Sequence, residues 1–265
     1  MTPSFGAEMT NAEFARYPSL RERAVVVTGG ASGIGASIVA HFAEQGARVG
    51  FVDFDAEAGR ALVGELGPNA EHCHFVEADL RDLAQLQAGM ARLAKELGQA
   101  PTVLVNNAAR DDRHTIAEVT PEYWDERMAT NLRHQFFSAQ ALIPGMVEAG
   151  GGSIINMSSV SYLLAQGGMP VYLTAKSAVI GLTRALARDL GRHRIRVNSV
   201  IPGWVMTERQ KRLWLTPKGE RKIAQEQCIP EKLYPPDIAR MVLWLAADDS
   251  RLVTAQSFVV DGGWT

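Results

Sequence analysis

The feature that most constrains this chain is its alternation of short apolar runs with longer amphipathic segments, from residue 24 to residue 260. The apolar runs are rich in β-branched residues, as in strands that are covered on both faces. We expect seven strands, at 24–28, 47–52, 74–78, 102–107, 152–157, 196–201 and 257–260. We expect helices between them, at 33–45, 56–66, 83–97, 121–148, 170–190 and 236–247.

Repeated strand–helix units predict a parallel sheet joined by right-handed crossovers. Pro121 and Pro236 stand at or just inside the start of an expected helix, where proline is favoured. No linker rich in Pro, Gly or Ser divides the chain, so we expect one α/β domain over 23–265. Its architecture should be a doubly wound parallel sheet of about seven strands with helices on both faces.

Two stretches interrupt the alternation. Residues 1–22 form an extension before the first expected strand, and residues 204–232 form an insertion before the last one. An insertion beside the carboxyl end of a strand is a candidate lid over a ligand crevice. The alternative is a peripheral helix pair with a solvated basic face, since RQKR stands at 209–212.

Composition excludes several classes of function. A formal net charge of −2 argues against affinity for nucleic acid or anionic membrane. No apolar stretch has the length of a membrane span or the form of a signal sequence, so a soluble cytoplasmic protein is expected. Cys73 and Cys228 are interpreted as buried or inert thiols, and the six histidines lack metal-ligand spacing.

A glycine-rich turn, TGGASGIG, follows the first strand directly and leads into the first helix. Glycine permits a tight turn and a close backbone approach, and a helix N-terminus offers free N–H groups to a pyrophosphate. The spacing of Gly29, Gly33 and Gly35 departs from the usual G-x-G-x-x-G. Its place between the first strand and helix makes a dinucleotide site the expectation, with Ser32 and Ile34 included.

Asp53 ends the second strand, where an acid accepts hydrogen bonds from ribose hydroxyls and repels a 2′-phosphate. No basic residue follows it immediately, and Ser32 rather than a basic residue precedes Gly33. Both observations favour NAD over NADP. Asp79 and Leu80 follow the third strand and are expected near the adenine, with a helix N-cap as the alternative for Asp79.

Tyr172 and Lys176, in the run YLTAK, are four residues apart on an expected helix and project from one face. An ammonium group near a phenol favours the phenolate, so Lys176 is expected to lower the pKa of Tyr172. Such a tyrosine can serve as a general base in the oxidation of an alcohol.

In this order the motifs resemble the short-chain dehydrogenase/reductase family over about residues 22–264. The matching elements are TGGASGIG, Asp53, Asp79-Leu80, NNAA at 106–109, Asn131, Ser159, YLTAK and PGWVMT at 202–207. The resemblance implies a Rossmann fold with seven parallel strands, assembled as a homotetramer or homodimer. Ala109 departs from the family, which usually has glycine there.

The resemblance also implies roles for individual residues. Ser159, Tyr172, Lys176 and Asn131 correspond to the catalytic set, in which Ser159 holds the substrate oxygen and Asn131 anchors a water near Lys176. The expected cofactor contacts further along the chain are Asn107, Ala108, Pro202, Gly203, Val205 and Thr207. Thr207 has an alternative role as the N-cap of the insertion.

Shorter runs resemble a narrower group, the bacterial aldose 1-dehydrogenases that act on sugars such as D-xylose or D-galactose. These runs include DDRH at 111–114, NLRH at 131–134 and DGGW at 261–264. The expected substrate contacts are Ser159, Tyr172, Arg113, His114, Gln166, Trp204, Arg209 and Gln210, with Trp214 as another stacking candidate. The charged run at 111–114 has an alternative as a solvated loop or subunit contact, and the tryptophans as packing residues.

One position departs from that group, which has a Trp-His pair shortly after the catalytic serine. This chain has Tyr162 and Leu163 there, so Gln166 is expected to supply hydrogen bonds. The leading hypothesis is NAD-dependent oxidation of an aldose at C1 to the aldonolactone. The alternatives are a dehydrogenase of a secondary alcohol, such as a hydroxy acid, 3-oxoacyl thioester or keto-deoxy sugar acid, and a dinucleotide-binding sensor without turnover.

Overall fold

A computed structural model describes residues 14–265, and its centre is a parallel sheet of seven strands. All seven expected strands are present, each within a residue or two of the expected bounds. They are β1 Ala24–Thr28, β2 Arg48–Asp53, β3 Cys73–Glu77, β4 Val103–Asn106, β5 Gly152–Met157, β6 Ile195–Pro202 and β7 Ser257–Val260.

The order of the strands creates a crevice at the middle of the sheet. The order is β3-β2-β1-β4-β5-β6-β7, so β1 pairs with β2 on one side and with β4 on the other. The chain therefore leaves β1 and β4 in opposite directions, and the loops after these two strands diverge. In open parallel sheets, ligands bind at such a switch point, beyond the carboxyl ends of the strands.

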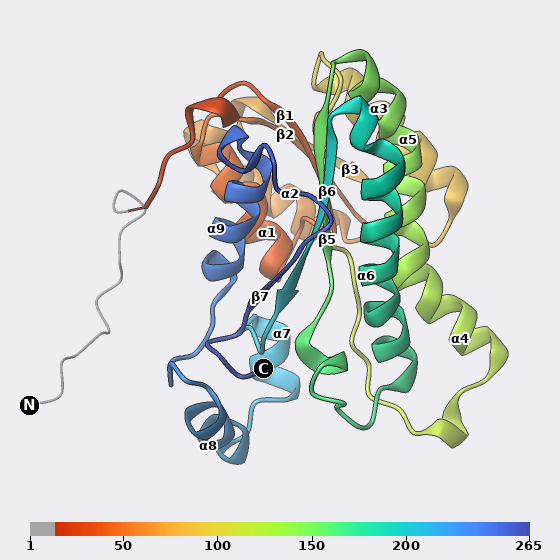
Figure 1. Ribbon diagram of the computed structural model, residues 1–265, viewed down its shortest axis with the longest axis vertical. Coiled ribbons are helices and arrows are strands. Elements are labelled where there is room, and N and C mark those ends of the chain that lie inside the picture. The colour runs from red at the N-terminus through yellow and green to blue at the C-terminus, as the bar shows by residue number, and fades with distance from the viewer. Residues whose placement is uncertain (1–13) are drawn as a thin grey trace, which may run out of the picture.

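Helices cover both faces of the sheet (Figure 1). One layer consists of α1 Gly33–Glu44, α2 Ala56–Glu65 and α9 Pro235–Ala246, and the other of α3 Leu83–Glu96, α5 His134–Glu148 and α6 Pro170–Leu190. Alternation along β1 serves both layers: Val25 and Val27 pack in the α1/α9 core, while Ala24 and Val26 pack in the core of α3, α5 and α6. The expected doubly wound α/β domain is confirmed.

The segment expected as one helix over 121–148 contains an irregular turn. It consists of α4 Pro121–Met128, a π-helical turn Ala129–Arg133 and α5. A π turn inserts one extra residue into a helix, and such turns are frequent at functional sites. Asn131 lies within this turn and is fully buried.

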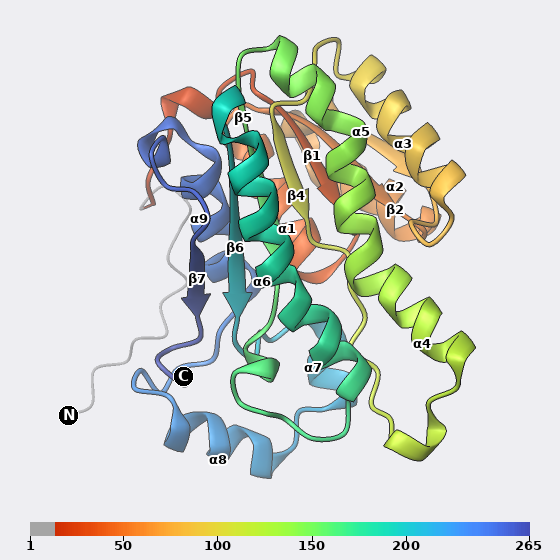
Figure 2. The ribbon, with the colours of Figure 1, turned by 45° about the vertical axis from the view of Figure 1, so that its right-hand side comes forward.

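The insertion lies beyond the carboxyl ends of the last strands. It forms α7 Glu208–Leu213 and α8 Pro217–Glu226, toward which the arrowheads of β6 and β7 point (Figure 2). Part of the N-terminal extension, 14–22, includes the 3₁₀ turn Pro18–Leu20, which buries Leu20 in the core. The expected extension at residues 1–13 lies outside the described residues.

The two cysteines differ in environment. Cys73 is buried as expected, and burial raises the pKa of its thiol to about 11. Cys228 is exposed, so of the two interpretations, buried or inert, only the second stays a prediction for it; it stands after α8, in the loop that leads to α9. Within residues 14–265, no helix combines the length and apolarity required to cross a bilayer.

His134 generates a prediction about stability. Its ring is fully buried at the start of α5. Burial, with a contribution from the charge of Lys176, lowers the pKa of His134 to about 3, although the backbone of Ala129 and Thr130 acts in the opposite direction. The folded protein therefore keeps the ring neutral, whereas the unfolded chain binds a proton below about 6.5, so stability is lost as pH falls below that value.

We expect His134→Leu to weaken this acid sensitivity by about 2 kcal/mol between pH 8 and pH 5, because the unfolded chain then gains one proton fewer. Urea unfolding at both pH values and fixed protein concentration measures the difference. An unchanged pH dependence would mean that His134 is protonated in the folded protein.

Candidate active site

A cavity of about 2020 Å³ opens at the carboxyl edge of the sheet. Pockets that hold one drug-sized ligand have about 300–1,000 Å³, so this cavity has room for two ligands side by side. All fourteen residues expected to contact only the cofactor line it: Gly29, Ser32, Gly33, Ile34, Gly35, Asp53, Asp79, Leu80, Asn107, Ala108, Pro202, Gly203, Val205 and Thr207.

The glycine-rich turn leaves no room for larger residues. Gly29 and Gly33 have φ angles of 63° and 56°, which favour glycine. A Cβ at Gly35 would lie 1.9 Å from the carbonyl oxygen of Gly29, and one at Gly29 would lie 2.7 Å from Cα of Ala108. The helix N-terminus is therefore bare backbone facing the cavity, as a pyrophosphate requires.

The loop after β4 is fastened to this turn. The side-chain amide of Asn107 donates to the carbonyl oxygens of Thr28 (3.1 Å) and Gly29 (2.8 Å). The Thr28 hydroxyl accepts from the backbone N–H groups of Asn107 (3.0 Å) and Ala108 (3.2 Å). These four bonds hold together the two segments that diverge at the switch point.

Asp53 is buried at the end of β2, and its carboxylate faces the glycine-rich turn. Oδ2 accepts from the N–H of Ala31 at 3.0 Å, and Oδ1 accepts from the N–H of Asp55 at 3.2 Å. Burial raises the pKa of Asp53, while the bond from Ala31 opposes that shift. Each carboxylate oxygen retains a lone pair, so the group can accept from two vicinal ribose hydroxyls.

Asp79 lines the cavity but does not cap α3. Asp82 caps that helix by accepting from the N–H groups of Ala84 and Gln85. Asp79 instead holds the guanidinium of Arg81, with a shortest contact of 2.7 Å, and this hydrogen bonding lowers its pKa. The alternative of an N-cap role is therefore wrong, because the helix begins three residues later than that role requires.

Ser159, Tyr172 and Lys176 converge on the cavity from the end of β5 and the first turns of α6. The Lys176 ammonium donates to the carbonyl oxygen of Met157 at 2.9 Å and lies 5.7 Å from the centroid of the Tyr172 ring. The Ser159 hydroxyl exchanges a 2.9 Å hydrogen bond with that of Ser161, a residue that sequence reasoning missed.

The pKa of Tyr172 differs from the expectation. Burial raises it above its ordinary value, and the charge of Asp111 adds to that, while hydrogen bonding by Ser159 and the charge of Arg113 lower it. Burial also lowers the pKa of Lys176 to about 7. The expectation that Lys176 makes Tyr172 more acidic was wrong for the protein alone, because desolvation penalises both charged forms.

Asn131 does not line the cavity. Its amide donates to the carbonyl oxygen of Arg127 at 2.9 Å and accepts from the N–H of Arg110 at 2.8 Å. The carbonyl oxygen of Asn131 lies 3.4 Å from Nε2 of Gln135, which is also 3.4 Å from the carbonyl of Met157 that Lys176 contacts. Asn131 thus connects the β4 loop to the surroundings of Lys176.

The expected substrate residues separate into two groups. Arg113, Gln166, Trp204, Arg209, Gln210 and Trp214 line the cavity with Ser159 and Tyr172. His114 does not, because its buried ring points toward α4 and the start of α6 instead. The guanidinium of Arg113 lies 4.9 Å from the Trp214 ring centroid and makes no ion pair with any residue in the described part of the chain.

The insertion is docked on the loop after β4. Gln210 accepts from the Trp204 indole at 3.0 Å and donates to Asp111 at 2.7 Å, and Arg209 contacts Asp112 at 2.9 Å. The Thr207 hydroxyl accepts from the N–H of Gln210, which confirms its N-cap role. Since Thr207 also lies against Gly33, α7 closes one side of the cavity.

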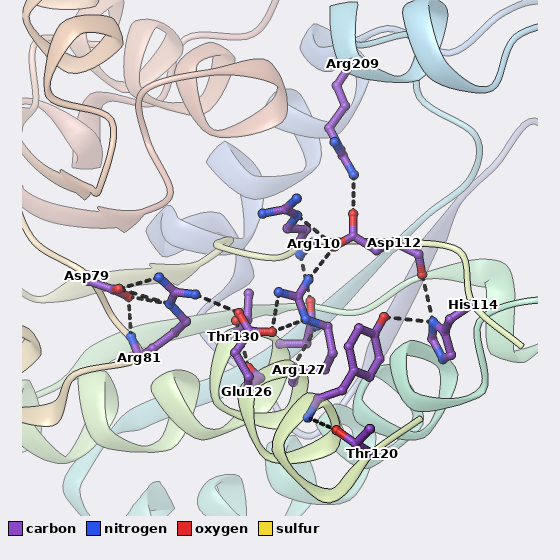
Figure 3. A network of polar contacts seen from close by, with 12 residues as sticks. Asp79, Arg81, Arg110, Asp112, His114, Thr120, Glu126, Arg127, Thr130 and Arg209 are labelled. Carbon is purple, nitrogen blue, oxygen red and sulfur yellow. Dashed lines mark hydrogen bonds and ion pairs between the residues drawn. The ribbon is translucent and has the colours of Figure 1, made fainter. Parts of the chain in front are cut away.

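An ionic network surrounds the same loop (Figure 3). Asp112 contacts Arg110, Arg127 and Arg209, which belong to three different segments. Arg127 in turn contacts Glu126, which joins the Asp79–Arg81 pair. Sequence reasoning identified the run DDRH but missed the partners of its two aspartates, since Arg127 in α4 is 15 residues from Asp112 and Arg209 in α7 is 98 residues from Asp111.

In the described part of the chain, no three His, Cys, Asp or Glu side chains group in a way that could hold a metal ion.

Comparison with known proteins agrees with the motifs and the fold. A family model described as enoyl-(acyl carrier protein) reductase matches residues 29–265. A solved short-chain type dehydrogenase/reductase from Mycobacterium ulcerans superposes with a TM-score of 0.87 at 27% identity, covering 93% of this chain and 90% of that one. The chain belongs to the short-chain dehydrogenase/reductase family.

Two curated relatives share 47% identity with the chain over 250 residues. One is the "Probable galactose dehydrogenase GalD" of Rhizobium meliloti (strain 1021), and the other is the D-xylose 1-dehydrogenase of Caulobacter vibrioides. Each match covers 94% of this chain, with 97% and 98% of the respective relative. A solved blue fluorescent protein from a metagenomic library, in complex with NADPH, matches at 35% identity with a TM-score of 0.85 over 93% of this chain and 99% of that one.

Membership of the family makes the protein an oxidoreductase that uses a nicotinamide cofactor. The bare glycine turn, the two free lone pairs of Asp53 and the size of the cavity fit such a dinucleotide. The cavity is lined by the cofactor residues that the motifs indicated.

Gly35→Ala is expected to abolish dinucleotide binding, because its methyl group would overlap the Gly29 carbonyl and push the turn into the cavity. Titration of NADH fluorescence measures the dissociation constant, which should rise by more than about tenfold. Gly64→Ala is the matched control, since a Cβ there contacts nothing within 4 Å. Wild-type affinity in Gly35→Ala would show that the turn does not hold the cofactor.

Proposed function

We propose that the protein catalyses the NAD-dependent oxidation of an aldose at C1 to the aldonolactone. The observation that carries this proposal is the meeting of Ser159, Tyr172 and Lys176 in a cavity lined by polar side chains suited to a sugar. The 47% identity to the galactose and D-xylose dehydrogenases supports a free sugar as the substrate.

A bound nicotinamide would supply the acceptor for the hydride of C1 of the sugar, and its positive charge would favour the phenolate. The protein supplies the rest of the reaction. Tyr172 takes the proton of the C1 hydroxyl as the C1–O bond becomes a carbonyl. The Ser159 hydroxyl, held by Ser161, donates to that oxygen and fixes its position.

Lys176 is the proposed proton relay beside the phenol of Tyr172. Its buried amine has a pKa of about 7, so it can take or release a proton near neutral pH. Asn131, in the π turn, and Gln135 connect the carbonyl groups near this amine. The proposed catalytic residues are therefore Ser159, Tyr172 and Lys176. Asn131 acts on them indirectly, through Gln135.

The substrate would lie between the β4 loop and α7. Arg113 presents guanidinium donors with no carboxylate partner among the described residues, and Gln166 adds an amide to the same cavity. Asp111 keeps free lone pairs beside its bond from Gln210, so it can accept from sugar hydroxyls. Trp204 and Trp214 offer flat apolar surface for the sugar ring. In this proposal 204–232 acts as the lid.

NAD is the proposed cofactor, and the acid at the end of β2, Asp53, supports this choice because such an acid would repel a 2′-phosphate. The protein is proposed to work as a cytoplasmic homotetramer or homodimer. The free thiols of Cys73 and Cys228 suit a reducing compartment, and the exposed edge strand β7 offers backbone groups to a second subunit.

Tyr172→Phe is expected to reduce kcat by at least about 100-fold, since it removes the proton acceptor while keeping the ring. NADH formation from a panel of aldoses measures the rate, and NADH fluorescence should report an unchanged cofactor affinity. A variant that retains most of its rate would exclude Tyr172 as the base. If the wild type oxidises secondary alcohols and no aldose, the sugar assignment is wrong.

Asp53→Ala is expected to reduce the preference for NAD over NADP by about tenfold or more, the equivalent of losing one charge-assisted hydrogen bond. The ratio of kcat/KM with the two cofactors measures this. Asp53→Asn is the companion variant, because it keeps one oxygen to accept from the N–H of Ala31 while it removes the charge and replaces the second acceptor with an amide donor. Equal ratios in wild type and Asp53→Ala would contradict the ribose contact.

A further inference from the structure

The first turn of α6 receives no cap from its own N-cap residue. Met169 occupies that position, and its side chain accepts from Arg113 rather than from the helix, while Pro170 at the next position has no N–H group. The first N–H that needs an acceptor is that of Val171, because early N–H groups of a helix have no partner within it. Tyr172 is the next residue, so the same turn positions the phenol.

His114, from the loop after β4, supplies the missing acceptor. Its Nε2 accepts from the N–H of Val171 at 3.3 Å, and its own backbone N–H donates to the carbonyl oxygen of Gly168 at 2.8 Å. The residue therefore binds the chain on both sides of the helix start. His114 is 8% exposed and stays outside the cavity lining, so it reaches neither ligand.

The orientation of the His114 ring is fixed from the opposite side (Figure 3). Nδ1 lies 2.9 Å from the Tyr123 hydroxyl and 3.1 Å from the carbonyl oxygen of Asp112. Since Nε2 accepts, these bonds assign the proton to Nδ1. The Tyr123 ring packs edge-on against the imidazole, with 5.0 Å between the ring centroids. The guanidinium of Arg127 lies over the Tyr123 ring, 5.5 Å from its centroid.

We propose that His114 is a positioning residue: it holds the first turn of α6 so that the hydroxyl of Tyr172 meets the substrate oxygen beside Ser159. This inference rests on the proposed role of Tyr172 as the base. It replaces the expectation that His114 contacts the substrate. A displacement of about 1 Å at a reacting group can cost about 100-fold in rate, so a fixed helix start matters for turnover.

The test compares two amide variants. The oxygen of Gln can reach the place of Nε2, whereas the shorter Asn reaches only the place of Nδ1. His114→Asn should therefore reduce kcat for the aldose by about tenfold to 100-fold with an unchanged KM for NAD, and His114→Gln should recover most of the loss. With C1-deuterated sugar, the isotope effect on kcat should increase in His114→Asn, because hydride and proton transfer become slower than product release.

A wild-type kcat in His114→Asn would overturn the inference. The inference would also be overturned if both variants lost kcat equally and the loss matched the decrease in their thermal unfolding midpoints. That pattern would indicate a structural role alone. If His114→Asn does not fold, Tyr123→Phe serves instead: it removes one of the two contacts that fix Nδ1 and should reduce kcat with the same isotope signature, and a wild-type kcat there would count against the inference.

Tyr172→Phe separates this inference from the proposed function. If the Tyr172→Phe variant is active, Tyr172 is not the base, and the proposed mechanism is wrong. An inactive Tyr172→Phe beside a fully active His114→Asn leaves the mechanism standing and refutes only the positioning role.

Discussion

The close approach of two backbone segments at the centre of the sheet is the constraint on which the site depends. The glycine-rich turn after β1 touches the loop after β4 so closely that one added carbon at Gly29 would overlap Ala108. The amide of Asn107 and the hydroxyl of Thr28 turn this contact into a fixed joint. The joint orients the dinucleotide cradle on one side and the loop 110–114 on the other.

The substrate side of the cavity is arranged around loop 110–114. The backbone N–H of Arg110 donates to Asn131 in the π turn. Asp111 and Asp112 bind side chains of α7, and His114 accepts a hydrogen bond from the start of α6. The elements that carry or cover the proposed chemistry thus share one support. A loop that looks solvated and charged in the sequence thus contacts α4, the π turn, α6 and α7.

Much of this was predictable from the sequence. The strands followed from β-branched apolar runs, and the glycine turn, Asp53 and the Tyr172–Lys176 pair followed from motifs whose chemistry depends on local spacing. The partners of His114, Asp111 and Asp112 could not be predicted, because they lie on other elements and no local sequence pattern encodes these contacts. The raised pKa of Tyr172 was missed for a related reason: a sequence gives the neighbouring charge of Lys176 but not the depth of burial.

The contact between α7 and the β4 loop has a consequence for solution conditions. Arg209 bridges Asp111 and Asp112 with its side chain partly open to water, so dissolved ions screen that attraction. The attraction between α7 and the β4 loop therefore weakens as ionic strength rises.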